Sequence, residues 1–132
     1  MSHIIAQVKE IQSVQNLNII SFTCNDTVLK MMSLDLNKTI TKGAQVMLTC
    51  KPTAIAIGKN VQGELSYANQ LDVNIRSLET GELLSALQLA FGEFTLESII
   101  TTDSQKRMQL KVGDTVTAFI KASDLSIKEV LS

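Results

Sequence analysis

The chain has 132 residues, 45% hydrophobic and 19% charged, which is typical of a soluble globular protein of one ordinary domain or two very small ones. Its net charge is −1, and it has one tyrosine, four phenylalanines and no tryptophan. It therefore lacks both the basic excess of a nucleic-acid or anionic-membrane binder and the aromatic side chains of a base-stacking platform. Residues 1–10 do not have the pattern of a signal peptide, and no apolar run approaches the roughly 20 residues of a membrane span. We expect a cytoplasmic protein with no membrane and no nucleic-acid partner.

In the first half, alternating apolar and polar residues predict a strand over 4–8 and a second strand around Ile20 and Phe22. A third strand is expected over 28–32. After a turn at Lys42 and Gly43, two more strands are expected over 46–50 and 54–57. Cys24 and Cys50 are expected to be half-buried thiols on strands, because free cysteine behaves as a small hydrophobe.

The second half repeats this order after a polar linker over 58–66, which is too short to let two units move far apart. One short helical turn is expected in it, where a cap-like start precedes good helix formers. The strands are expected over 71–75, around 87–91, over 94–100, over 116–120 and over 125–127, with the helical turn over 103–108 and a turn over 112–114.

The two halves align as diverged copies of one unit of about 65 residues. Residues 43–57 lie over 113–127 at an offset of 70, and residues 4–11 lie over 71–78 at an offset of 67. Between them an offset of 68 places Ser33 over Thr101. The increase of the offset from 67 to 70 along the chain predicts small insertions in the second copy, near Gly92 and around 105–107. We divide the chain into units 1–62 and 63–132.

Each copy therefore has about five short strands and one helical turn, and we expect its own last strand to close it. A small closed barrel of the OB type fits this count and leaves no long edge strand. The predicted fold class is all-β, with two tandem OB-like five-stranded barrels. A lone unit of this size is only marginally stable, so packed units or an oligomer are expected.

Four segments of the second half resemble the molybdate-binding Mop (TOBE) domain: Ser66–Leu71, Ile100–Ser104, Leu110–Asp114 and Ile120–Leu125. The pattern of that family is Ser-Ala-Arg-Asn-x-Leu, then Ile-Thr-x-x-Ser, then Lys-Ala/Ser-Ser/Thr-x-Val. In the first half, residues 32–35 and 51–53 resemble parts of the same pattern. A chain that consists almost entirely of two tandem copies of this unit is similar to the molbindins, which are small cytoplasmic proteins that store molybdate or tungstate.

The resemblance implies OB-like barrels with oxyanion sites at the seams between them. It also implies a homo-oligomer, with a trimer favoured over a dimer, that binds molybdate or tungstate. No nucleophile–base pair, redox centre or metal-ligand cluster is visible in the sequence, so binding without catalysis is expected. No side chain is expected to ligate the metal directly.

Molybdate at neutral pH is a tetrahedral dianion whose oxygens only accept hydrogen bonds, so hydroxyls, backbone N–H groups and a lysine suit it. Spacing alone favours a simpler role, in which Thr101 and Ser104 cap the helical turn and Lys121 faces solvent. The resemblance favours a ligand role instead. The predicted oxyanion-binding residues are Thr101, Ser104, Lys121, Ser123, Ser66, Asn69, Ser33 and Lys51.

Three departures from the family pattern weaken the first copy or the site as a whole. Ala68 stands where the family has arginine, Leu36 stands over Ser104, and Pro52 removes a backbone donor. We therefore expect second-copy residues to carry most of the binding. One alternative is a barrel pair that has lost its ligand and serves as an interaction module or a regulatory accessory of molybdate transport. A nucleic-acid-binding OB module is disfavoured by charge and aromatic content.

Overall fold

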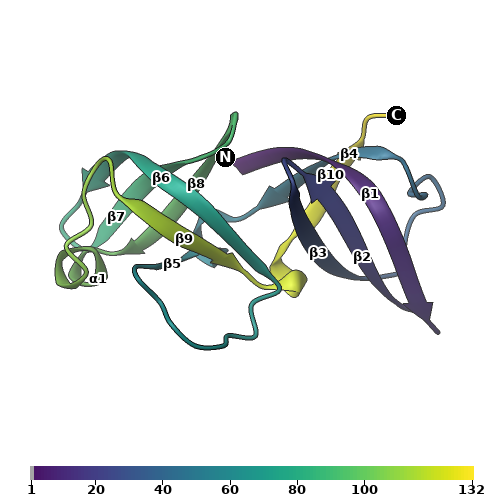
Figure 1. The fold of residues 1–132 in the computed structure, drawn as a ribbon, viewed down its shortest axis with the longest axis horizontal. Coiled ribbons are helices and arrows are strands. Elements are labelled where there is room, and N and C mark those ends of the chain that lie inside the picture. The colour runs from purple at the N-terminus through teal and green to yellow at the C-terminus, as the bar shows by residue number, and fades with distance from the viewer. Residues whose placement is uncertain (1) are drawn as a thin grey trace.

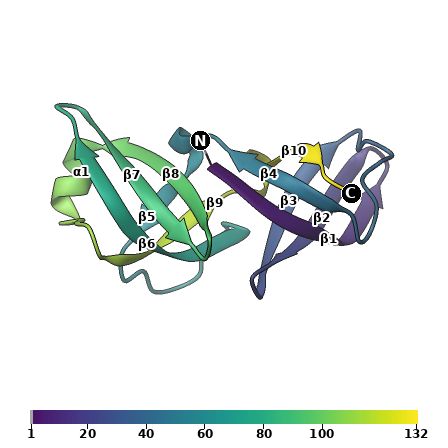
Figure 2. The ribbon, with the colours of Figure 1, turned by 90° about the horizontal axis from the view of Figure 1, so that it is seen from above.

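The chain forms two five-stranded antiparallel sheets in the computed structural model, which describes residues 2–132. Each sheet curls around its own interior, and the two resulting lobes lie side by side (Figures 1 and 2). The first half contributes β1 (Ser2–Val14), β2 (Leu17–Cys24), β3 (Thr27–Leu34), β4 (Gln45–Cys50), a 3-10 turn η1 (Pro52–Ala54) and β5 (Ala56–Gly58). The second half contributes β6 (Asn69–Thr80), β7 (Leu84–Phe91), β8 (Phe94–Thr101), α1 (Thr102–Arg107), β9 (Thr115–Ile120), η2 (Ala122–Asp124) and β10 (Ser126–Val130). The predicted all-β fold class is confirmed.

The two halves exchange their last strands. The strand orders are β10-β4-β1-β2-β3 in the first lobe and β5-β9-β6-β7-β8 in the second. In Figure 1, yellow β10 accordingly lies with the purple and blue strands, and β5 lies with the green ones. Ser126 pairs with Thr49 of β4, and Ala56 pairs with Phe119 of β9.

The expectation that each copy closes with its own last strand was therefore wrong. The physical reason lies in the backbone around η1, where Lys51 and Ile55 on either side of the turn are both extended. The chain thus runs forward into the neighbouring lobe and does not fold back onto β4, and Lys121 and Leu125 flank η2 in the same way. The division of the chain into two domains, 1–62 and 63–132, stays a prediction made from the sequence repeat.

The strand register places the two copies at an offset of 67 from β1 to the end of β3. Leu17 pairs with Leu34 as Leu84 pairs with Thr101, so Leu34 and not Ser33 is the counterpart of Thr101. The hairpin tips also keep this offset, so the insertion predicted near Gly92 was wrong. The two copies therefore differ in length at one place only, the segment between the third and fourth strands. This segment has 13 residues in the second copy (102–114) and 10 in the first (35–44).

This longer segment contains α1, the one α-helix of the described chain. The Oγ1 of Thr101 caps it by accepting a hydrogen bond from the Ser104 N–H at 3.1 Å. At the matching position of the first copy Leu34 has no hydroxyl, and the next residue, Asp35, has a φ of +52°. The helical turn predicted over 103–108 is therefore confirmed, whereas the matching segment 35–44 contains no helix and the short helical turn of the first copy is η1. No helix within residues 2–132 is long and apolar enough to cross a membrane.

The core consists of the inward-facing residues of both sheets, which form one continuous apolar cluster. β6 shows the reason, since every second residue from Asn69 to Ile75 is buried. Burial of this apolar surface is the main stabilising term of such a fold. Cys24 and Cys50 belong to the cluster as free thiols, and both are buried more completely than the half-buried state expected.

Two buried polar side chains join the lobes in matching ways. The Asn69 side chain accepts a hydrogen bond from the Lys30 N–H at 2.7 Å and donates to Lys30 O at 2.9 Å and Ile120 O at 3.1 Å. Ser2, its counterpart at an offset of 67, accepts a hydrogen bond from the Glu97 N–H at 2.8 Å. Lys30 and Glu97 are 67 residues apart as well, so the lobes are related by an approximate twofold symmetry.

Candidate functional site

Three of the predicted oxyanion-binding residues line one hollow of about 500 Å³ at the seam between the lobes. Thr101, Ser104 and Lys121 meet there with Thr53, which η1 brings across from the first half. We call this the Lys121 hollow. Its complete lining is Thr53, Ala54, Ile55, Ala56, Tyr67, Leu84, Ile99, Ile100, Thr101, Ser104, Lys121 and Asp124.

The hydroxyls of Thr101 and Ser104 are held in place by local hydrogen bonds. Thr101 Oγ1 donates to Ser104 Oγ at 2.9 Å, and Arg107 Nη2 donates to the same Ser104 oxygen at 3.3 Å. The capping role that spacing alone favours is thus observed. The ligand role stays a prediction, because a hydroxyl can rotate to donate to an anion instead.

A buried polar network fixes α1 onto the second sheet beneath these hydroxyls. Thr102 Oγ1 donates to Gly81 O at 2.8 Å and lies 2.9 Å from Ser85 Oγ. Gln105 Nε2 donates to Leu110 O at 3.3 Å. Because Thr102 and Gln105 are buried, the helix is oriented with Thr101 and Ser104 on the side of the Lys121 hollow.

The ammonium of Lys121 has no carboxylate partner. Lys121 is an exposed residue at the start of η2, and within residues 2–132 the one ion pair joins Lys59 and Asp114, at 3.8 Å. An unpaired cation beside four hydroxyl-bearing residues, Tyr67 among them, gives the Lys121 hollow the donors that an acceptor-only dianion needs.

Lys51 and Ser123 line a second hollow of about 450 Å³, which we call the Lys51 hollow. Its other hydroxyl-bearing residues are Thr49 and Ser126. Ser33 lies elsewhere, in a hollow of about 280 Å³ that it shares with Ser123 and in which Asp35 is the one charged lining residue. The predicted first-copy residues Ser33 and Lys51 are therefore not brought together.

Ser66 and Asn69 are not brought to these hollows either. Ser66 is exposed in the segment before β6, and both donors of the buried Asn69 amide are engaged by backbone carbonyls. The sequence prediction missed Thr53 and Asp124 as site residues. Thr53 belongs to the Lys-x-Ser/Thr motif of the first copy, but only the strand exchange places it beside Lys121.

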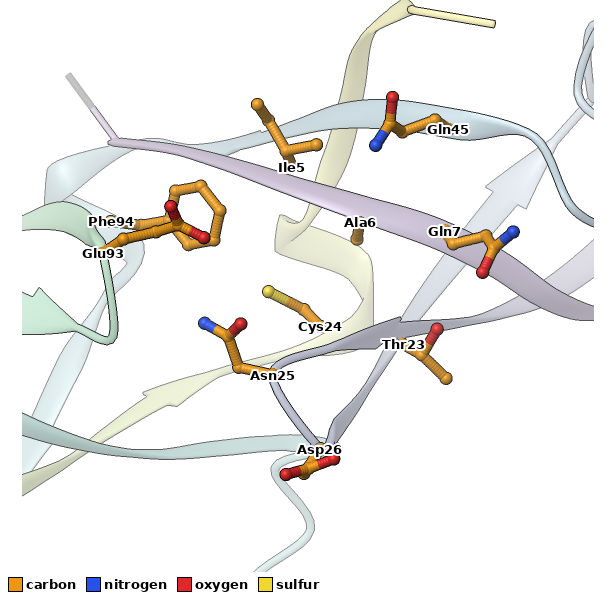
Figure 3. Close-up of a pocket in the computed structure, with 10 residues that line it drawn as sticks. All are labelled: Ile5, Ala6, Gln7, Thr23, Cys24, Asn25, Asp26, Gln45, Glu93 and Phe94. Carbon is orange, nitrogen blue, oxygen red and sulfur yellow. The ribbon is translucent and has the colours of Figure 1, made fainter.

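A hollow of about 520 Å³ between the hairpin tips differs in charge from the two lysine-lined hollows. Asp26 and Glu93 line it and no lysine or arginine does, so it would repel an oxyanion. Figure 3 shows the Cys24 sulfur and the Asn25 amide pointing toward the tip that carries Glu93. Burial, and to a lesser extent Glu93, raise the pKa of the Cys24 thiol.

Cys50, at the edge of the Lys51 hollow, is also a neutral thiol. Burial, and secondarily the Asp124 carboxylate, raise its pKa to about 11, and its Sγ lies 3.6 Å from Lys51 O. A thiol that stays protonated is a poor nucleophile and a poor metal ligand. Across the described residues, no three His, Cys, Asp or Glu side chains are grouped so that they could hold a metal ion.

The family model of the TOBE domain matches residues 65–127, which run from the end of the linker into β10. This segment is similar to the TOBE domain. It contains Thr101, Ser104 and Lys121, so the resemblance seen in the motifs of the second half is confirmed. The matched segment does not include η1 or β5, and β5 adds the outer strand of its sheet from the first half.

The whole fold, both lobes included, is shared with a protein of known structure. The cytoplasmic molybdate-binding protein ModG, in a form with molybdate bound, superposes with a TM-score of 0.88 at 18% identity, over 95% of this chain and 93% of that one. A molybdate binding protein from Sporomusa ovata matches 53% of this chain and all of its own, at 28% identity and a TM-score of 0.47. No curated protein matches the sequence. At its low identity the ModG match shows a common fold.

Proposed function

We propose that this protein binds molybdate or tungstate and stores or buffers the oxyanion in the cytoplasm. The observation that carries the proposal is the Lys121 hollow, where an unpaired ammonium meets the hydroxyl residues Thr53, Thr101 and Ser104. The similarity of the second half to the TOBE domain supports it. So does the shared fold with ModG, which is described as cytoplasmic and as molybdate-binding.

The chemistry of the hollow suits a tetrahedral dianion better than a larger organic ligand with donors of its own. Hydroxyls and the ammonium donate to acceptor-only oxygens, while the apolar side chains of Ile55, Ile99 and Ile100 limit the water that screens them. The arginine of the family pattern is replaced by the exposed Ala68. Lys121 is then the main source of positive charge for this site.

The Lys51 hollow is proposed as a second, unequal anion position. It offers one lysine and the hydroxyls of Thr49, Ser123 and Ser126, but no counterpart of the Thr101–Ser104 pair. The hollow around Ser33 offers no cation and is not proposed as a site. The chain therefore has anion positions of more than one kind.

A homo-oligomer, with a trimer favoured over a dimer, is part of the proposal. Exposed apolar side chains stand at the β6–β7 turn, where Leu83 is 79% exposed and Leu84, which lines the Lys121 hollow, is 58% exposed. The first lobe exposes Val14 and Leu34, at 73% and 67%. Contact between two different patches is head-to-tail and forms a ring such as a trimer when the rotation closes, whereas a twofold dimer uses one patch twice.

Equilibrium dialysis against molybdate and against tungstate, with metal analysis of the retained protein, tests the proposal. Wild-type protein is expected to retain either oxyanion at micromolar concentration. Lys121→Ala is expected to bind roughly tenfold more weakly, since it loses a charge-assisted contact. Lys38→Ala, an exposed lysine of the first-lobe loop, is the matched control and should bind as wild type. No retention by wild-type protein would sink the proposal.

A further inference from the structure

One carboxylate forms part of the wall of both candidate anion positions. Asp124 and Ala54 line the Lys121 hollow and also the Lys51 hollow, so the two hollows meet at this pair of residues. They are repeat counterparts at an offset of 70, on η2 and η1. The duplication thus places a charge on one side of the shared wall and a methyl group on the other.

The charge of Asp124 is not neutralised by a neighbouring cation. Although Lys121 begins the same turn and Lys51 lines the adjoining hollow, neither forms an ion pair with it, and within residues 2–132 the one ion pair is Lys59–Asp114. Asp124 and Cys50 both line the Lys51 hollow, and after burial the Asp124 carboxylate is the second cause of the raised pKa of the Cys50 thiol. Each hollow therefore holds one lysine and the Asp124 carboxylate, which are not joined in an ion pair.

The consequence depends on whether the bound oxyanion carries a proton. A carboxylate only accepts hydrogen bonds, and at neutral pH molybdate and tungstate likewise only accept, so the two repel each other without a compensating bond. Phosphate keeps a proton at neutral pH and can donate it to a carboxylate oxygen. We infer that Asp124 sets the oxyanion selectivity of the two hollows, disfavouring fully deprotonated tetrahedral dianions relative to proton-bearing ones. The inference rests on the proposed function.

Repulsion between the Asp124 carboxylate and a deprotonated dianion weakens the binding of that dianion. It therefore discriminates between the two kinds of oxyanion without adding affinity for either. Its size is set by the distance between like charges and by solvent screening. For a partly solvated hollow this amounts to roughly a five- to tenfold weakening of dianion binding, reduced at high ionic strength. Asp124→Asn removes the charge with little change of shape.

The test measures molybdate and phosphate binding by equilibrium dialysis at pH 7 for wild type and Asp124→Asn, at low and at high salt. The variant is expected to bind molybdate roughly five- to tenfold more tightly and phosphate more weakly, and the molybdate gain should shrink in high salt. Asp72→Asn, which removes an exposed carboxylate of β6 outside both hollows, is the matched control and should change neither affinity. Ala54→Asp adds a carboxylate to the same wall and should weaken molybdate binding.

The outcomes separate this inference from the proposed function. If wild type binds molybdate but Asp124→Asn leaves both affinities unchanged, or moves them equally in one direction, the inference is overturned alone. If neither protein retains either anion, the proposed function and the inference are overturned together. Thermal melting of each variant shows whether a loss of binding reflects a loss of fold, and the expected gain in molybdate affinity cannot come from unfolding.

Discussion

Asn69 joins the lobes with a single fully buried side chain. Its amide uses both donors and its oxygen on backbone groups, two of them on Lys30 of the other lobe. This asparagine belongs to one of the segments that resemble the family pattern, and the sequence prediction assigned it to the oxyanion site. The structure gives it contacts that hold β3 of the first lobe against β6 of the second, and Ser2 makes the corresponding contact to Glu97.

Replacing Asn69 by alanine is expected to lower the free energy of unfolding by about 2–3 kcal/mol, because the Lys30 and Ile120 backbone groups lose their partners in a buried seam. Urea unfolding followed by circular dichroism measures this change. Ser66→Ala, in the exposed segment just before β6, is the control and should stay within about 0.5 kcal/mol of wild type. A similar small effect for Asn69→Ala would contradict the role assigned to the amide.

Helix α1 shows how one short element makes the two copies unequal. The three additional residues of 102–114 form a helical turn whose cap hydroxyl, Thr101, is absent from the first copy, where Leu34 stands. The helix presents Thr101 and Ser104 to the Lys121 hollow and inserts Thr102 and Gln105 into the second lobe. An element that carries site residues on one face is thus anchored by polar residues on the other.

Thr102→Val keeps the side-chain shape but removes the hydroxyl that bonds to Gly81 O and Ser85. We expect a loss of about 1–2 kcal/mol in the free energy of unfolding, since the buried Ser85 hydroxyl and the Gly81 carbonyl lose a partner. Thr95→Val, at an exposed position of β8, is the matched substitution and should be nearly neutral. Thermal unfolding of the two variants in parallel makes the comparison, and equal melting temperatures would show that the network does not anchor α1.

The strand exchange joins the two lobes, because each sheet includes a strand from the other half of the chain. β10, from the end of the chain, covers the edge of β4 in the first lobe, and the C-terminal Leu131 donates its N–H to Gln45 O. β5 does the same for β9 in the second lobe. Each lobe is therefore completed by residues that its own half of the sequence does not contain.

Truncation after Asp124 removes β10 and tests this directly by hydrogen exchange. The exchange rates of the β4 amides, Val46 to Cys50 in the first lobe, are expected to rise most, because their sheet loses its outer strand. β9 of the second lobe keeps β5 and β6 as neighbours and should remain the better protected of the two. Increased exchange confined to β9 would instead indicate that each copy closes with its own last strand.

The sequence by itself determined the duplication, the all-β class, the faces of the strands and the helical turn of the second copy. These features follow from local patterns: alternation selects the buried face of a strand, and a hydroxyl three residues before a backbone N–H caps a helix. It also named Thr101, Ser104 and Lys121, which lie together in one hollow.

Only the tertiary structure decided which lobe each last strand joins, and from this follow the places of Thr53, Asp124 and Asn69. The physical reason is that β5 and β10 are copies of one another, so either can present a suitable edge to β4 or to β9. Periodicity encodes which face of a strand is buried and not which neighbour it pairs with. That choice depends on the extended backbone at η1 and η2 and on the packing of both lobes at once.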